Sequence, residues 1–217
     1  MKRLLFCLFL FSGCASTVHF STPNDIYKEK VVLWLTDKSK IAGQITVSLE
    51  KNISLYSVTY PSFIEFIPEG ASETKHINLN DIIGYSLGAD FYALKQVETN
   101  LDGILHLLFV KRLTGEDSKL QLYELYESGR ANPTGEAGYS YYLSLPSFVP
   151  LQTINTRSSS LVPYFDVKMS KIVADCPQLA DKIQMKEPGY FLSMTLFNVK
   201  KQPEVLLRII NEYNNCK

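Results

Sequence analysis

Residues 31–49, VVLWLTDKSKIAGQITVSL, decide the class of the fold. Two apolar runs rich in β-branched residues, at 31–36 and 41–49, flank the polar tetrapeptide DKSK at 37–40. Runs of this kind favour strands, and a short polar connection between two of them is typical of a β-hairpin. The sequence therefore predicts a sheet that begins with this hairpin.

The strand pattern recurs as far as residue 145, and turn-forming Gly, Pro, Asn, Asp or Ser residues bound each run. The run ILHLLFV at 104–110 is apolar on both faces and is expected in the middle of a sheet. The run SYYLSL at 140–145 alternates instead, which predicts a half-exposed strand. The further strands are expected at 53–59, 63–67, 77–87, 104–113, 119–126 and 139–145.

Helical spacing begins after Val162. Phe165, Met169 and Ile172 fall on one face of a first helix. Asp175 is expected to cap a second helix, in which Pro177 occupies the first turn.

A last helix is predicted from Pro203, because an apolar stripe follows that proline at helical spacing. The stripe comprises Val205, Leu206, Ile209, Ile210 and Tyr213. The run YFLSMTLF at 190–197 is ambiguous between strand and helix, and its neighbours favour a helix. The predicted fold class is therefore α+β: an antiparallel β-rich half, either a small barrel or a curled sheet, followed by a short C-terminal helical tail.

The N-terminus has the pattern of an export signal. Lys2 and Arg3 precede an apolar run at 4–11, and small residues follow at 12–16. The apolar run is too short to span a bilayer as a helix, which needs about 20 residues. We therefore expect a signal peptide over 1–13.

The tetrapeptide FSGC at 11–14 resembles the lipobox of bacterial lipoproteins, which implies lipidation of Cys14. In such lipoproteins an Asp after the cysteine retains the protein at the inner membrane, whereas this chain has Ala15. The expected location is the outer membrane, with the protein lipid-anchored and facing the periplasm. Ordinary secretory cleavage at the same small residues, which would give a soluble periplasmic protein, stays open as the alternative.

With Cys7 in the signal and Cys14 lipidated, Cys176 and Cys216 remain. Two cysteines in an exported protein predict one disulfide, because the periplasm is oxidising. Two free thiols or a cysteine nucleophile are the alternatives. The expected organisation is a signal peptide at 1–13, a lipidated N-terminus and tether at 14–29, a β-rich domain at 30–152 and a helical segment packed on it at 153–217.

The chain has 22 basic and 22 acidic residues. Loss of Lys2 and Arg3 with the signal leaves 20 basic residues against 22, a net charge of −2. A balanced chain without a long Lys or Arg run has no electrostatic footprint for nucleic acid. The expected link to a membrane is the N-terminal lipid.

The pentapeptide GYSLG at 84–88 matches the G-x-S-x-G pattern of serine hydrolases by letter. A hydrolase needs a strand, a tight elbow and a long helix around Ser86, with a His later in the chain. The following ADFYALKQV is too short for that helix, and the only later His, His106, lies on an expected strand. We therefore assign Gly84 and Gly88 to a strand bulge and a turn, and expect no catalysis.

The three histidines, His19, His76 and His106, lie far apart and in different contexts. Neither an H-x-x-H nor a C-x-x-C spacing is present. No metal and no other cofactor is expected.

Five tyrosines cluster on both sides of a Gly-containing loop at 127–138. A Tyr-rich strand face can bind glycans or peptides, because the ring stacks while the hydroxyl stays in water. The competing explanation is that Tyr suits half-buried strands. The candidate binding surface comprises Tyr123, Tyr126, Tyr139, Tyr141 and Tyr142.

Several segments resemble a largely uncharacterised family of small exported proteins and lipoproteins of Bacteroidota. The segments are VVLWLTDKSKIAGQI, INLNDIIGYSLGADFY, KLQLYELYES with YSYYLSLP, and DCPQLADKI with IINEYNNC. The resemblance covers 30–216 and implies a β-rich half with a short helical tail that carries a D-C-P and a Y-N pair. It places 84–88 in a strand and implies no substrate.

The expected function is that of a lipid-anchored envelope protein with a binding or scaffolding role towards another envelope protein. A glycan- or peptide-binding module that uses the same tyrosines is the alternative. A serine hydrolase acting through Ser86 is the least favoured.

Overall fold

The computed structural model describes residues 20–49, 52–54, 57–59, 61–98, 105–127, 138–145, 151–154, 161–193 and 202–216. The first strands are β1 (Phe20–Thr22), β2 (Asp25–Leu35), β3 (Lys40–Ser48), β4 (Asn52–Ser54), β5 (Ser57–Thr59), β6 (Phe63–Pro68) and β7 (Lys75–Asn78). After the 3₁₀ turn η1 (Leu79–Asp81) come β8 (Ile82–Leu87), β9 (Asp90–Glu98), β10 (Leu105–Arg112), β11 (Gln121–Glu127), β12 (Gly138–Ser144) and β13 (Gln152–Thr153). The helices are α1 (Phe165–Ile172), α2 (Pro177–Gln184) and α3 (Gln202–Asn215).

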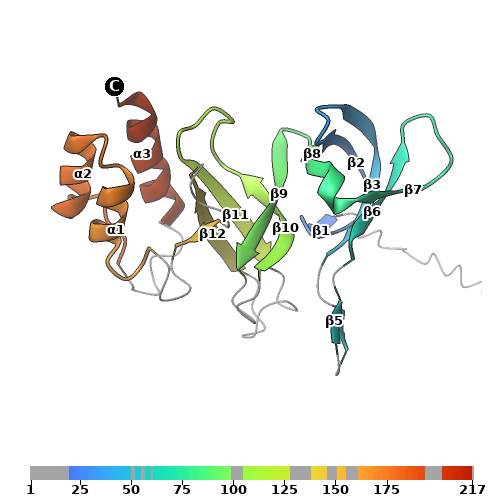
Figure 1. Cartoon of the computed structure of the whole chain (residues 1–217), viewed down its shortest axis with the longest axis horizontal. Helices are drawn as coiled ribbons and strands as arrows, with labels where there is room; N and C mark the ends of the chain where they lie inside the picture. Colours follow the sequence, from blue (N-terminus) through green and yellow to red (C-terminus); the bar gives the residue numbers. More distant parts are fainter. Residues whose placement is uncertain are drawn as a thin grey trace, which may run out of the picture.

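The strands form one large antiparallel sheet with the order β13-β12-β11-β10-β9-β8-β2-β3-β6-β7, and β1 pairs with β2 beside this path. Strands β4 and β5 form a separate two-stranded sheet. Helices α1–α3 gather at one end of the large sheet, beside β11 and β12, while β2, β3, β6 and β7 lie at the other end (Figure 1). The predicted α+β class is confirmed, and between the two predicted forms the described strands make an open sheet.

The hairpin at 31–49 is confirmed, since β2 and β3 pair in register from Lys30 to Trp34. A hydrogen bond stabilises the turn between the two strands: the Ser39 amide donates to Asp37 Oδ1 at 2.8 Å. Lys38 adopts a φ of 70°, a left-handed conformation that the hairpin turn requires.

The turn between β1 and β2 is tied to distant strands by buried hydrogen bonds. Strand β10 pairs with β11 only at Lys111 and Arg112, so the backbone of Phe109 lacks a β11 partner. The Asn24 side chain takes that place: its Nδ2 donates to Phe109 O at 3.0 Å, and Phe109 N donates to its Oδ1 at 2.7 Å. In addition, Tyr85 OH donates to Pro23 O at 2.9 Å. The buried Asn24 side chain thus joins the β1–β2 turn to the middle of β10.

The buried side chains form two hydrophobic clusters, which we call the sheet core and the helical core. The sheet core consists of buried residues from β2, β3, β6, β8, β9 and β10 together with inward residues of β11 and β12. The helical core lies between the other face of β11–β12 and the three helices. In α3, Leu206, Ile209 and Ile210 are fully buried and Tyr213 nearly so, which confirms the predicted stripe.

Four sequence predictions about strands need correction. The run 53–59 is a hairpin of β4 and β5, not one strand. The run 77–87 is broken by η1, where Asn78 Oδ1 accepts from the Asn80 amide at 2.9 Å. Strand β9 was not predicted. The tether predicted through residue 29 is also wrong for its last residues, because β2 begins at Asp25.

Two predictions about the helical part also differ. The residue that caps α2 is Cys176, without a side-chain hydrogen bond, and Asp175 instead accepts a hydrogen bond from the Tyr213 hydroxyl. Residues 190–193 of the expected 190–197 helix are irregular, and the remaining four lie outside the described residues.

Candidate functional site

The five predicted tyrosines are divided between the two faces of the sheet. Strands β11 and β12 pair with Tyr123 opposite Tyr142 and Tyr126 opposite Tyr139. Tyr123 and Tyr142 are 1% exposed in the sheet core, and Tyr141 packs into the helical core. Because adjacent strand residues point to opposite faces, a single five-tyrosine surface does not form. Only Tyr126, half-buried, and Tyr139, 52% exposed, remain near the surface.

These two tyrosines border a polar cluster. The rings of Tyr126 and Tyr139 lie 5.0 Å apart. On the same face the paired positions continue through Tyr141, Glu124 and Lys111 of β12, β11 and β10. We call these five residues, with Asp90 and Tyr92 on β9, the tyrosine patch.

Hydrogen bonds and an ion pair connect the polar groups of the patch. Lys111 Nζ lies 2.8 Å from Asp90 Oδ2. The Tyr141 hydroxyl donates to the Glu124 carboxylate, and the Tyr92 hydroxyl donates to Asp90. The patch therefore combines the exposed ring of Tyr139 with two half-buried carboxylates, Asp90 and Glu124, and with two tyrosines, Tyr92 and Tyr141, that are buried.

Burial sets the protonation of the patch. Burial raises the pKa of Glu124, and the Tyr141 hydrogen bond and Lys111 oppose that rise. Burial and the Glu124 carboxylate raise the pKa of Tyr141 to about 12. Burial, together with Asp90 and Glu124, likewise raises the pKa of Tyr92 to about 12. Both hydroxyls consequently stay protonated and act as hydrogen-bond donors at neutral pH.

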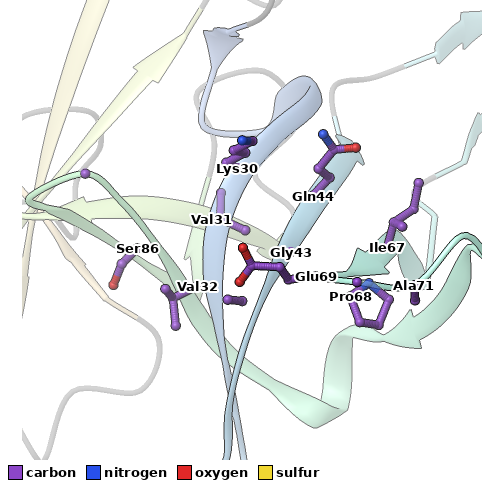
Figure 2. A pocket seen from close by; sticks show the side chains of 13 residues that line it. Lys30, Val31, Val32, Gly43, Gln44, Ile67, Pro68, Glu69, Ala71 and Ser86 are labelled. Carbon is purple, nitrogen blue, oxygen red and sulfur yellow. The ribbon is translucent and has the colours of Figure 1, made fainter.

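A second feature, which we call the sheet groove, is a cavity of ≈ 490 Å³ over β2 and β3 (Figure 2). Its walls are the β6–β7 turn at 69–71 and the start of the β8–β9 turn at Gly88. Lys30, Gln44, Glu69 and Ser86 bring polar side chains to it. These residues come from four separate segments, so only the strand register unites them.

The GYSLG segment contributes to this groove through Ser86. Ser86 lies on β8, opposite Val32 of β2 and Phe91 of β9. Gly88 has a φ of 59° in the turn, and β9 follows where a hydrolase has its long helix. Beside Gly84 the β2–β8 register shifts, and a Cβ there would approach Tyr92 O to 2.2 Å. The bulge and turn assigned to the two glycines are confirmed.

Within the described residues, no group of three or more His, Cys, Asp or Glu side chains could hold a metal ion. His76 is exposed on β7, and its ring stacks on Phe63 at 4.5 Å. His106 is buried in β10, while His19 lies outside the described residues. None of the described helices is long and apolar enough to cross a membrane.

The sulfur atoms of Cys176 and Cys216 lie at disulfide-bonding distance, 2.02 Å, with Cα atoms 5.9 Å apart. The pair joins the start of α2 to the residue that follows α3. Cys14 and residues 128–137 of the expected contact loop lie outside the described residues.

Comparison with known proteins finds no matching family model, no matching curated protein and no matching solved structure. Sequence patterns missed Asp90, Tyr92 and Lys111 of the patch, because cross-strand pairing places them beside the tyrosines. One signal was visible in the sequence: residues 123 and 126 are an odd number of positions apart, so on one strand their side chains point to opposite faces of the sheet.

Proposed function

We propose that this protein is a lipid-anchored envelope protein that binds another envelope protein through the tyrosine patch and performs no catalysis. The lipobox-like FSGC at 11–14 supports the anchor. The Cys176–Cys216 pair supports an oxidising compartment, in which disulfides persist.

One observation carries the binding role: the exposed Tyr139 ring lies beside the half-buried Glu124, which accepts a hydrogen bond from the buried Tyr141. Tyrosine is enriched among the residues that dominate protein interfaces, because it buries a large ring and keeps a polar hydroxyl. A hydrogen-bonded carboxylate next to the ring adds directional selectivity for a donor on the partner.

The anchor is tested by the intact mass of the natively expressed protein from the membrane fraction, measured with and without reductant before alkylation. We expect a chain that begins at Cys14 and carries acyl groups, with two thiols alkylated only after reduction. An unlipidated chain in the soluble periplasmic fraction would overturn the anchor.

The binding surface is tested by placing a photo-crosslinking amino acid at position 139 and, as a matched control, at Tyr27. Tyr27 is 56% exposed on β2 and is not a patch residue, against 52% for Tyr139. We expect a discrete envelope protein crosslinked from position 139 and absent from position 27. Equal products from the two positions, or none from 139, would contradict the proposal.

A glycan ligand is the second candidate, favoured by the ring of Tyr139 next to the Asp90 and Glu124 carboxylates. Sugars stack on aromatic faces and donate hydroxyls to such acceptors. Soluble polysaccharide fragments from the envelope would then suppress crosslinking from position 139. Crosslinking unaffected by these fragments favours the protein partner.

A further inference from the structure

The floor of the sheet groove is aliphatic. Val32 of β2 is 37% exposed there, and Ala42 lies opposite it on β3. Ile67 and Pro68, at the end of β6, add apolar surface. Among the described residues that line the groove, none is aromatic. A small aliphatic group fits this floor, whereas a sugar would lack a ring on which to stack.

Four polar side chains surround that floor without partners. Within the described part of the chain, Lys30, Gln44, Glu69 and Ser86 form no side-chain hydrogen bond or ion pair. Lys30 and Glu69 carry opposite charges on the same cavity and still do not pair with each other. Figure 2 shows the Glu69 carboxylate reaching over the strands, on the same side as Ser86 and Val32. All four groups are therefore available to a ligand.

The groove also exposes main chain. Gly43, Gly70 and Gly88 line it without side chains. The described β2–β8 pairing ends at Val32 and Ser86, so β2 continues through Lys30 without β8 alongside. Unpaired strand backbone is the surface to which an extended peptide adds through its own amide groups.

We propose that the sheet groove binds a short extended peptide with free termini and a small aliphatic side chain. The peptide carboxylate faces Lys30, its ammonium faces Glu69, and its side chain packs on Val32. A phosphate or other polyanion is disfavoured, because Glu69 would repel it while Lys30 alone attracts it. The cavity volume lies within the range of about 300–1,000 Å³ that small ligands occupy.

This inference is independent of the proposed function. Val32, Ser86 and Phe91 occupy paired positions, while Tyr85 and Tyr92, the adjacent residues, lead to the tyrosine patch. Because adjacent strand residues alternate, the groove and the patch lie on opposite faces of the sheet. The loss of either activity leaves the other intact.

The test is calorimetric titration of the full, detergent-solubilised chain with the tripeptide Ala-Val-Ala and its N-acetylated and C-amidated forms. We expect saturable binding of the free tripeptide, weakened about fivefold by blocking either terminus, as for an exposed ion pair. Lys30→Ala should abolish the difference between acid and amide. Glu69→Gln should abolish the difference between free and acetylated amine.

Matched controls are Lys75→Ala and Glu204→Gln, which change exposed charges outside the groove and should leave all affinities unchanged. Val32→Phe, which fills the floor, should abolish binding, whereas Ile83→Phe at a similarly exposed β8 position should not. No saturable heat with the free tripeptide, equal affinity in the Lys30 and Glu69 variants, or binding of maltose in its place would each overturn the proposal.

Discussion

The sheet core and the helical core are completed by different means. In the sheet core, two buried hydrogen bonds between the Asn24 side chain and the Phe109 backbone join the β1–β2 turn to β10. In the helical core, α1 and α2 have only eight residues each, and a cysteine pair 40 residues apart in sequence ties α2 to α3. Helices that short are marginal by themselves, so they depend on packing and on the covalent tie. One chain thus uses a polar contact where strands already pair and a crosslink where the local structure is weak.

The largest expected effect comes from replacing Cys176 and Cys216 together by Ser. The chain-entropy model assigns a loop of this length about 4 kcal/mol of unfolding free energy as an upper figure. Because the tie lies in the helical core, the helical circular dichroism signal should be lost at lower urea than the fluorescence of Trp34, the single tryptophan, on β2. Coincident transitions in this variant would show that the two cores do not differ in this way.

Asn24→Ala should have the next largest effect and reverse the order of the two signals. It leaves the Phe109 amide and carbonyl buried without these bonds, at a cost of about 2–3 kcal/mol. Trp34 fluorescence should then change at lower urea than the helical signal. Asn78→Ala, which removes an exposed turn bond, is the control and should cost about 1 kcal/mol or less. Equal losses from the two asparagines would refute the role of Asn24.

The smallest expected effect distinguishes one carboxyl group in each region by pH. Hydrogen bonds from Lys182 and Tyr190 lower the pKa of Glu212, so its contribution to stability is present above its unfolded-state pKa and is lost as pH falls through the folded-state pKa. Burial raises the pKa of Glu124, so its contribution falls as pH rises from the unfolded-state pKa through the folded-state pKa.

Urea midpoints measured between about pH 3 and about pH 7 check these opposite signs. Glu212→Gln should lose stability at neutral pH and less of it on acidification, and Glu124→Gln should gain stability at neutral pH. Each change should be below about 1 kcal/mol, because both groups are partly exposed. Shifts of the same sign in both variants would contradict the assignment.

Local patterns predicted the elements whose signal is contained in their own residues. The 31–49 hairpin and the α3 stripe are examples, because alternation and helical spacing are visible within about ten residues. Strand β9 was missed because its alternation is weak, with Tyr92 and Ala93 both buried, and pairing with β8 and β10 defines it. The first residues of β2 resembled a tether in sequence. A bulge at Lys28, with a φ of 54°, interrupts the alternation of apolar and polar residues there.

The candidate sites were less predictable than the fold. The sequence grouped Tyr126 and Tyr139 with Tyr123 and Tyr142, and only the strand register separates the two pairs. The sheet groove gave no sequence signal, because Lys30 and Glu69 come together only when β2, β3 and β6 pair.

The buried position of residues 22–24 also has a mechanical consequence. Thr22 and Asn24 are almost completely buried, and Asn24 is bonded to the middle of β10. A pull on the N-terminal segment is therefore transmitted into the interior of the sheet, not to an edge strand that could peel away. Unfolding the domain by force applied at the N-terminal segment must break the Asn24 hydrogen bonds and the β2–β3 ladder. The rate of this forced unfolding is therefore that of global unfolding.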